Sequence, residues 1–297
     1  MSSVSPAAIA LVLAAAVAHA SWNLFSKQAS TTGAAFFLWL LAACGTVIYL
    51  PVAVVTDVVS HPYLTGFSWV FLVGTGVLQA GYFLFLQLGY GLGDLSLVYP
   101  IGRGSGALLA AIAGIVVLGE RPGPVAIAGI AAIIVGVVLI SLPNRGPAIA
   151  DAEPASHGLR AVPFALVTGM FIASYTLWDK YAVASLHTPP VLQGYAAFPF
   201  MTLVFWPFAA GDRARLMNVW HDFRPQIIGA AVLAPLAYIL VLAALSFSAV
   251  SAIAPAREVS VLFGVLLGRR MLGETGLARR LAAAAAIVTG IIAIAIG

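Results

Sequence analysis

The sequence predicts an all-α integral membrane protein whose ten transmembrane helices form two inverted repeats of five helices. Three observations lead to this prediction: the composition, the number of long apolar runs, and short motifs that occur once in each half. Of the 297 residues, 62% are hydrophobic and only 8% are charged, and the mean hydropathy is +1.06. A soluble domain carries about 25% charged residues. This chain therefore cannot cover a globular surface with polar groups, and lipid is its expected solvent.

Ten apolar runs are long enough to cross the hydrocarbon core of a bilayer, which takes about 20 helical residues. The runs are 5–26, 34–56, 67–89, 95–118, 123–142, 161–183, 190–210, 226–247, 250–268 and 277–296. Turn and helix-breaking residues separate most of them, as in "GYGLGD", "GERPGP" and "GETGLARR". The first run ends in "AHA", which has the form of a signal-peptidase site, but no Lys or Arg precedes it. We therefore expect this run to be the first membrane helix and not a cleaved signal peptide.

Three motifs of the first half return in the same order, and at nearly the same offset, in the second half. The matching pairs are "SWNLFSK" (21–27) with "SYTLWDK" (174–180), Pro100 and Arg103 with Pro255 and Arg257, and "LGE" (118–120) with "LGE" (272–274). One such pair arises by chance, whereas three in register indicate a duplication. We expect a first repeat over 1–143, a polar linker over 144–159 and a second repeat over 160–297.

Five spans per repeat make the second repeat enter the membrane from the opposite side. This is the inverted-repeat architecture that many secondary transporters use to build a site near the bilayer midplane. Most of the 14 Lys and Arg residues fall on one side of the predicted membrane. The positive-inside rule then places both termini outside the cytoplasm, in a multi-pass protein of the inner (plasma) membrane.

Charged residues inside two of the runs are the main candidates for a functional site. Arg103 lies in the fourth run, and Arg257 and Glu258 lie in the ninth. A charge at membrane depth costs about 2.5–3.5 kcal/mol and normally faces a wet cavity or a partner. Because the two runs enter from opposite faces, we expect these charges to meet in one central cavity. Pro100 and Pro255 precede them and are expected to break their helices.

Three roles for these charges remain open. Arg103 and Glu258 can form a structural ion pair, and an Arg103 released from Glu258 can bind a carboxylate or phosphonate through two hydrogen bonds; these two roles are compatible. The third role is snorkelling of the side chains to a membrane interface. Glu258 is also a candidate for carrying a proton, since burial favours the neutral form of a carboxyl group. His19 is the second proton candidate because histidine titrates near neutral pH; it is equally compatible with a hydrogen-bonded core histidine.

The segment around Arg103 is rich in small residues. Gly102, Gly106, Ala110 and Gly114 are spaced four apart, so we expect another helix to pack closely along that face. Arg103 lies about 100° round the helix from Gly102 and need not share the packed face.

Further polar and aromatic residues are candidates for lining the cavity and binding substrate. They are Trp22, Asn23, Tyr82, Tyr99, Tyr175 and Tyr238, with Gln79 and Gln87 as additional polar groups. Asn23 shares a helix face with His19, four positions earlier. For each of these residues the alternative is packing, or a hydrogen bond between helices.

Several other function classes are disfavoured. No Gly-x-x-x-x-Gly-Lys-Ser/Thr stretch is present, the basic residues form no stripe suited to nucleic acid, and Cys44 is the only cysteine. We therefore expect no cofactor, no metal and no nucleic-acid partner. An intramembrane enzyme using Ser105 and a passive channel are the alternatives to a transporter.

The ten runs in two halves, the "WNLFSK" end of the first run and the repeated "LGE" resemble the EamA branch of the drug/metabolite transporter superfamily. The resemblance covers nearly the whole chain. It implies a central cavity built from both repeats and alternating access to amino acids, metabolites or drugs. The expected function is secondary active transport of a small polar or anionic metabolite, coupled to protons or a counter-solute, by a monomer or homodimer.

Overall fold

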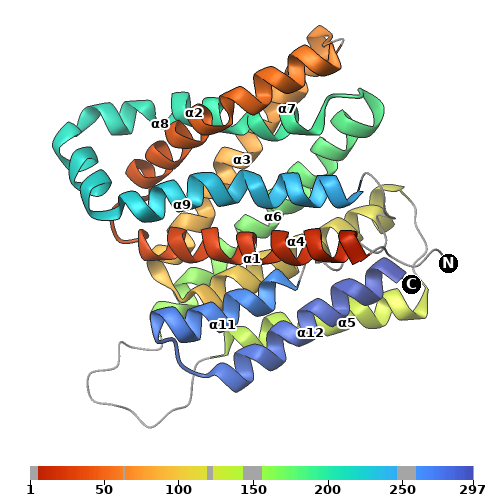
Figure 1. The fold of residues 1–297 in the computed structure, drawn as a ribbon. Coiled ribbons are helices and arrows are strands. Elements are labelled where there is room, and N and C mark those ends of the chain that lie inside the picture. The colour runs from red at the N-terminus through yellow and green to blue at the C-terminus, as the bar shows by residue number, and fades with distance from the viewer. Residues whose placement is uncertain (1–5, 63, 119–122, 143–155, 246–258, 297) are drawn as a thin grey trace.

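The computed structural model describes residues 6–62, 64–118, 123–142, 156–245 and 259–296, and all regular structure within these ranges is helical. In chain order the helices are α1 (Pro6–Gln28), α2 (Ala34–Ser60), α3 (Gly66–Leu92), α4 (Leu95–Leu118), α5 (Pro124–Ser141), α6 (Ser156–Ser185), α7 (Pro190–Tyr195), α8 (Ala197–Gly211), α9 (Arg213–Leu245), α11 (Ser260–Leu272) and α12 (Leu277–Ile296). The long helices run side by side as a bundle, and α1 begins at the end of the bundle where α12 ends (Figure 1).

Helices overlap all ten predicted apolar runs within the described residues. By length and composition, six stretches qualify as membrane spans: Ala34–Ser60, Gly66–Leu92, Leu159–Val183, Pro190–Gly211, Arg213–Leu240 and Leu277–Ile294. A shorter apolar stretch covers Pro124–Ile140. Many large apolar side chains of these helices are exposed, as expected for a surface that faces lipid.

Two helices differ from the predicted runs because proline interrupts them. The run over 190–210 is divided at Ala196 into α7 and α8, since Pro199 has no N–H to donate to the carbonyl of Tyr195. Helix α9 begins at Arg213 because a polar helical segment precedes the apolar one. The two segments join at Phe223, where φ is −124° and ψ is 16°, two residues before Pro225.

The expected helix break at Pro100 is wrong, because α4 runs through this residue to Leu118. Pro100 lies in the second turn, so its missing N–H removes only the hydrogen bond to the carbonyl of Ser96, and the rest of the helix continues. Pro255, the other expected break, lies outside the described residues.

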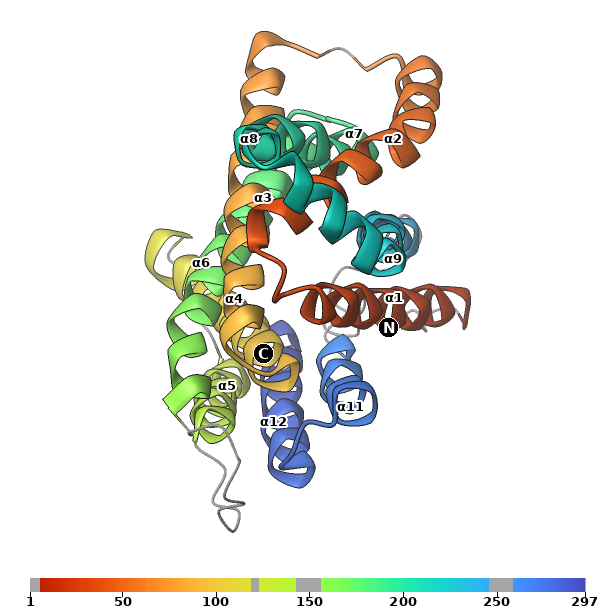
Figure 2. The same cartoon turned by 90° about the vertical axis from the view of Figure 1, so that its left-hand side faces the viewer.

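Helices of the two halves pack extensively on one another. Helix α1 packs on α9 and α11, α6 packs on α3 and α4, and α5 packs along α12. Helices α2 and α8 lie on one side of the bundle, and α5 and α12 lie on the opposite side (Figures 1 and 2). The main cluster of buried apolar side chains includes residues of α1, α2, α3, α4, α8 and α9, so one core joins the two halves.

Glycines allow two of these helix pairs to approach closely. A Cβ at Gly106 on α4 would lie 2.8 Å from Cγ2 of Ile172 on α6, and a Cβ at Gly169 would lie 2.9 Å from the backbone nitrogen of Gly106. Between α5 and α12, a Cβ at Gly129 would lie 2.6 Å from the carbonyl oxygen of Gly290. Gly102 and Gly106, the first two of the four small residues spaced four apart on α4, therefore face α6.

Candidate functional site

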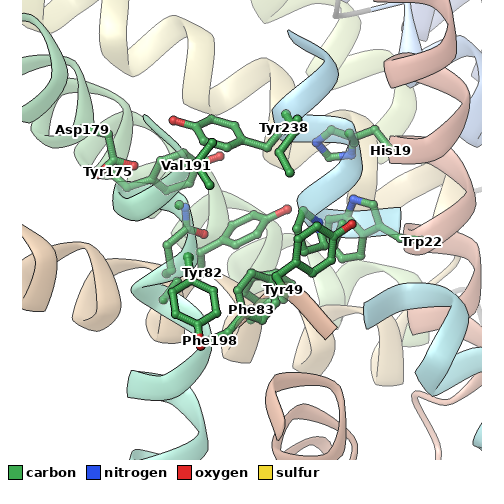
Figure 3. A pocket seen from close by; sticks show the side chains of 18 of the residues that line it. His19, Trp22, Tyr49, Tyr82, Phe83, Tyr175, Asp179, Val191, Phe198 and Tyr238 are labelled. Atoms are coloured by element: carbon green, nitrogen blue, oxygen red, sulfur yellow. The ribbon is translucent and has the colours of Figure 1, made fainter. Parts of the chain in front are cut away.

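A cavity lies between the two halves, and its walls come from α1, α2, α3 and α4 on one side and α6, α7, α8 and α9 on the other. The polar and aromatic residues that line it are His19, Trp22, Tyr49, Gln79, Tyr82, Phe83, Arg103, Tyr175, Asp179, Tyr195, Phe198 and Tyr238. The centres of water molecules can occupy about 110 Å³ of it, which is room for several waters. Figure 3 shows His19 and Trp22 on one side of this cavity and Tyr175 and Asp179 on the other.

Aromatic rings form a continuous wall across the cavity. The ring centroid of Trp22 lies 5.4 Å from that of Phe83 and 6.5 Å from that of Tyr82, and the ring of Tyr82 meets that of Tyr175 edge-on at 5.6 Å. Such edge-to-face and tilted pairs are the favoured geometries of aromatic side chains. The wall therefore offers a rigid apolar surface with phenolic hydroxyl groups along it.

Arg103 is the only Lys or Arg among the described residues that line the cavity. It follows the start of α4 by eight residues, about 12 Å along the helix, and is only 4% exposed. Its neighbours Gly102 and Gly106 face α6. Arg103 is thus held inside the bundle, beside a cavity with many aromatic side chains in its lining.

His19 is held by a chain of hydrogen bonds that spans four helices. Nδ2 of Asn23 lies 3.0 Å from Nδ1 of His19 and 2.7 Å from its carbonyl oxygen, while the hydroxyl of Tyr90 donates to Oδ1 of Asn23 at 2.5 Å. The hydroxyl of Tyr99 lies 3.3 Å from the same Nδ1 and 2.8 Å from Oγ of Ser260 on α11. The carbonyl of His19 and the hydroxyl of Tyr90 fix the orientation of the Asn23 amide. Nδ1 therefore accepts, which is the role it has in the neutral Nε2–H tautomer.

Asp179 forms a second buried polar cluster, with Thr75 on α3 and Gln193 on α7. Oδ1 of Asp179 accepts from the Thr75 hydroxyl at 2.5 Å and from Nε2 of Gln193 at 3.1 Å, and this Nε2 also lies 2.5 Å from the Thr75 hydroxyl oxygen. Gln193 is fully buried, and its Oε1 has no hydrogen-bond partner among the described residues. Trp178 adds a hydrogen bond from its indole nitrogen to the carbonyl of Phe71, at 2.9 Å.

A charged network lies at the end of the bundle where α1 and α3 end and α4 and α12 begin. The carboxylate of Glu274 accepts from the backbone N–H of Leu95 at 2.7 Å and of Ser96 at 3.0 Å, and Arg280 pairs with both Glu274 and Asp94. Nearby, Nζ of Lys27 donates to the carbonyl of Tyr90 at 2.6 Å. The network therefore links Asp94 and the start of α4 to the α11–α12 connection and to α12, and the Lys27 bond joins α1 to α3.

The structure brings together most, but not all, of the candidate residues named from the sequence. Seven of them line the cavity: His19, Trp22, Gln79, Tyr82, Arg103, Tyr175 and Tyr238. Asn23 and Tyr99 lie behind its wall, bonded to His19. Arg257 and Glu258 lie outside the described residues. Ser105 donates to the carbonyl of Ile101 at 2.7 Å in the α4–α6 contact, away from the cavity-lining residues.

Sequence reasoning missed Tyr49, Asp179 and Gln193. Asp179 is the one acidic residue in its apolar run, which is a signal that could have identified it, although the directly following Lys180 makes a local ion pair the simpler interpretation. Nothing in the pattern around Gln193 distinguishes it from other polar residues near a span end. Among the described residues, no group of three His, Cys, Asp or Glu side chains is placed to hold a metal ion.

Comparison with known proteins gives one family and one fold. Residues 6–142 match the model of the EamA-like transporter family, and no curated protein matches the chain. A solved structure, described only as the crystal structure of a protein, covers 97% of this chain and 96% of its own. It is 17% identical to this chain with a TM-score of 0.55. This likeness shows a shared fold and carries no information on substrate.

Proposed function

We propose that the protein is a secondary active transporter of a small polar or anionic metabolite, because residues 6–142 match the model of the EamA-like transporter family. One observation carries the proposal: a single cavity is lined from both halves of the chain. Alternating access needs such a shared site, since the two halves must move against each other around it.

The packing of the helices supports the ten-helix inverted repeat. In the predicted repeat, the counterparts of α1, α3 and α4 are α6, α9 and α11. If each helix is exchanged with its counterpart, the α1–α9 pair becomes the α6–α3 pair. In the same way, the α4–α6 pair becomes the α11–α1 pair. Both partners of each exchange occur. With five spans per half, the loop charges favour both termini outside the cytoplasm of a cell with an inner (plasma) membrane.

The cavity chemistry favours a ligand that carries a carboxylate on a compact apolar body. Arg103 supplies two parallel N–H donors suited to a carboxylate, and the aromatic wall of Trp22, Tyr82 and Tyr175 supplies apolar surface. His19 in the neutral Nε2–H tautomer, which fits its contact with Asn23, adds no second positive charge. Amino acids and organic acids meet this description.

The charged network of Asp94, Glu274 and Arg280 supports a gated cycle. The ion pairs of Arg280 with Asp94 and Glu274 connect the start of α4 to the start of α12. In an alternating-access transporter, such contacts hold one end shut while the other admits substrate, and they separate when the site turns to the opposite face.

Three probes that share an aromatic body and differ in charge test the substrate class: benzoate, phenylalanine and benzylammonium. The two probes with a carboxylate should raise the melting temperature of the purified protein, and benzylammonium should not. Phenylalanine loaded into proteoliposomes should also drive counterflow of labelled phenylalanine, which a passive channel does not do. Stabilisation by benzylammonium alone contradicts the proposed ligand class.

Arg103→Gln should weaken benzoate binding about 10- to 100-fold, because a hydrogen-bonded charge contributes about 1.5–3 kcal/mol. The dissociation constant follows from the ligand dependence of the melting temperature. Ser105→Ala, two residues along α4 in the α4–α6 contact, is the matched control and should bind benzoate like the wild type. Equal affinity in the wild type and Arg103→Gln removes Arg103 from the site.

A further inference from the structure

Asp179 is the only acidic residue among the described residues that line the cavity, and the proposed function gives it no task. It is 8% exposed and lies on α6, six residues before the helix ends at Ser185. Figure 3 shows it on the side of the cavity opposite His19. A carboxyl group at this place reaches both the cavity and the α3–α6–α7 contact.

The partners of Asp179 are neutral. Thr75 and Gln193 both donate to Oδ1, and Oδ2 accepts no hydrogen bond from a described residue. Within the described part of the chain, no ion pair involves this carboxylate; the pairs found there belong to Asp94, Asp222 and Glu274. A buried carboxylate without a cation partner pays a large desolvation cost and neutralises by taking up a proton.

Other groups that share the cavity are less suited to carry an exchangeable proton. The titratable or charged side chains around it, taken from every helix that lines it, are His19, Tyr49, Tyr82, Arg103, Tyr175, Tyr195 and Tyr238, and Lys180 and Tyr181 follow Asp179 on its own helix. Tyrosine and arginine titrate far above neutral pH. His19 becomes a cation only if Nδ1 takes a proton, and this atom already accepts from Asn23.

We propose that Asp179 is the proton-binding site of the transport cycle. A hydronium ion in the cavity water gives its proton to Oδ2, forming an O–H bond and leaving neutral water, and the proton returns to water when the cavity faces the other side. Thr75 and Gln193 keep Oδ1 in place in both states, because a protonated carboxyl group still accepts through its carbonyl oxygen. The coupling role rests on the proposed function, whereas the protonation itself does not.

Infrared difference spectroscopy of the protein in lipid, titrated from acid to alkaline buffer, detects the proton directly. Acidification of the wild type should produce a C=O stretching component of one protonated carboxyl group that is missing from the spectrum of Asp179→Asn. Asp57→Asn, the same change at an exposed position of α2, is the control and should keep the band. Asp179→Glu should restore it at a shifted frequency if the asparagine variant folds poorly. A spectrum identical in the wild type and Asp179→Asn overturns the proposal.

Thr75→Val separates a proton site from a merely structural carboxylate. Loss of the Thr75 donor weakens the charged form more than the neutral one, so the band should titrate at a higher pH than in the wild type. A structural carboxylate that stays ionised shows no band to shift in either protein, which counts against the proposal.

Transport of phenylalanine into proteoliposomes tests the coupling. Asp179→Asn should lose the acceleration of uptake by a pH gradient while keeping counterflow, because exchange of substrate needs no net proton movement. Loss of counterflow as well assigns Asp179 to substrate binding and contradicts the proposal. If wild-type protein carries no phenylalanine but shows the carboxyl band, the proposed transport of amino acids fails while the proton site stands.

Discussion

Glu274 connects the two halves of the chain through a single carboxylate. It accepts from the backbone N–H groups of Leu95 and Ser96, which open α4, and it pairs with Arg280. The first N–H groups of a helix have no partner within the helix, and the helix dipole favours negative charge at this end. The repeated "LGE" marks Glu274 in the sequence without indicating which helix it caps.

Glu274→Gln should lower the unfolding free energy by about 1–3 kcal/mol, because an amide N–H then faces the donors of Ser96 or Arg280. Arg280 keeps its ion pair with Asp94, which limits the loss. The melting temperature in detergent measures the effect. Arg270→Ala removes an exposed charge from the last turn of α11 and is expected to change little. Equal melting temperatures for both variants contradict a capping role for Glu274.

The α4–α6 pair is an element-scale feature that fixes the position of Arg103. Gly102 and Gly106 face α6, and the Ser105 hydroxyl occupies the space above Gly169. A helix that presents its small residues to a neighbour turns the adjacent position, here Arg103, about 100° away. The close approach of the two helices is therefore part of how the guanidinium reaches the cavity.

Gly169→Ala should destabilise the protein by about 1–3 kcal/mol through overpacking. The added Cβ would lie 2.0 Å from the Ser105 hydroxyl and 3.0 Å from the carbonyl oxygen of Gly102, and the helix backbone cannot yield as a side chain does. Thermal unfolding measures the loss. Gly66→Ala, at the start of α3 with open space around it, should be close to neutral. If Gly169→Ala unfolds like the wild type, the contact is looser than described.

In the molecule as a whole, the cavity lies between the two halves, and the proposed gate is the charged network at the end where α4 and α12 begin. The ion pairs of Arg280 join Asp94 in the first half to Glu274 in the second. Rocking of one half against the other must separate these residues if the proposed cycle is correct. Movement of the two halves can therefore be tested directly at these ion pairs.

A bifunctional thiol reagent can cross-link the two halves in the double variant Asp94→Cys with Arg280→Cys. The native cysteine, the only one in the chain, is removed by Cys44→Ala. Cross-linking should abolish phenylalanine counterflow while leaving benzoate-dependent stabilisation intact, because binding needs one open face and transport needs two. The pair Arg213→Cys with Met217→Cys, exposed one turn apart on α9, is the control. Full transport by the cross-linked Asp94–Arg280 pair rules out separation at this end.

The lipid environment, most helical segments and several cavity-lining residues can be predicted from the sequence alone. Composition and the length of the apolar runs decide that lipid surrounds the chain, because too few charged residues exist to face water. The match of residues 6–142 to the EamA-like family agrees with the resemblance drawn from the motifs. The cost of placing Arg103 at membrane depth marks it as exceptional without its partners being known.

Which residues share the cavity depends on how the helices pack and cannot be predicted from the sequence. Asn23 and Tyr99 are as polar as Tyr82 and Tyr238, yet the first two lie behind the wall and the others line it. Asp179 joins Thr75 and Gln193 across three helices, a juxtaposition that no spacing along one helix encodes. The physical reason is that a helical period fixes the face of each residue on its own helix, whereas the rotation and crossing of helices depend on packing between distant segments.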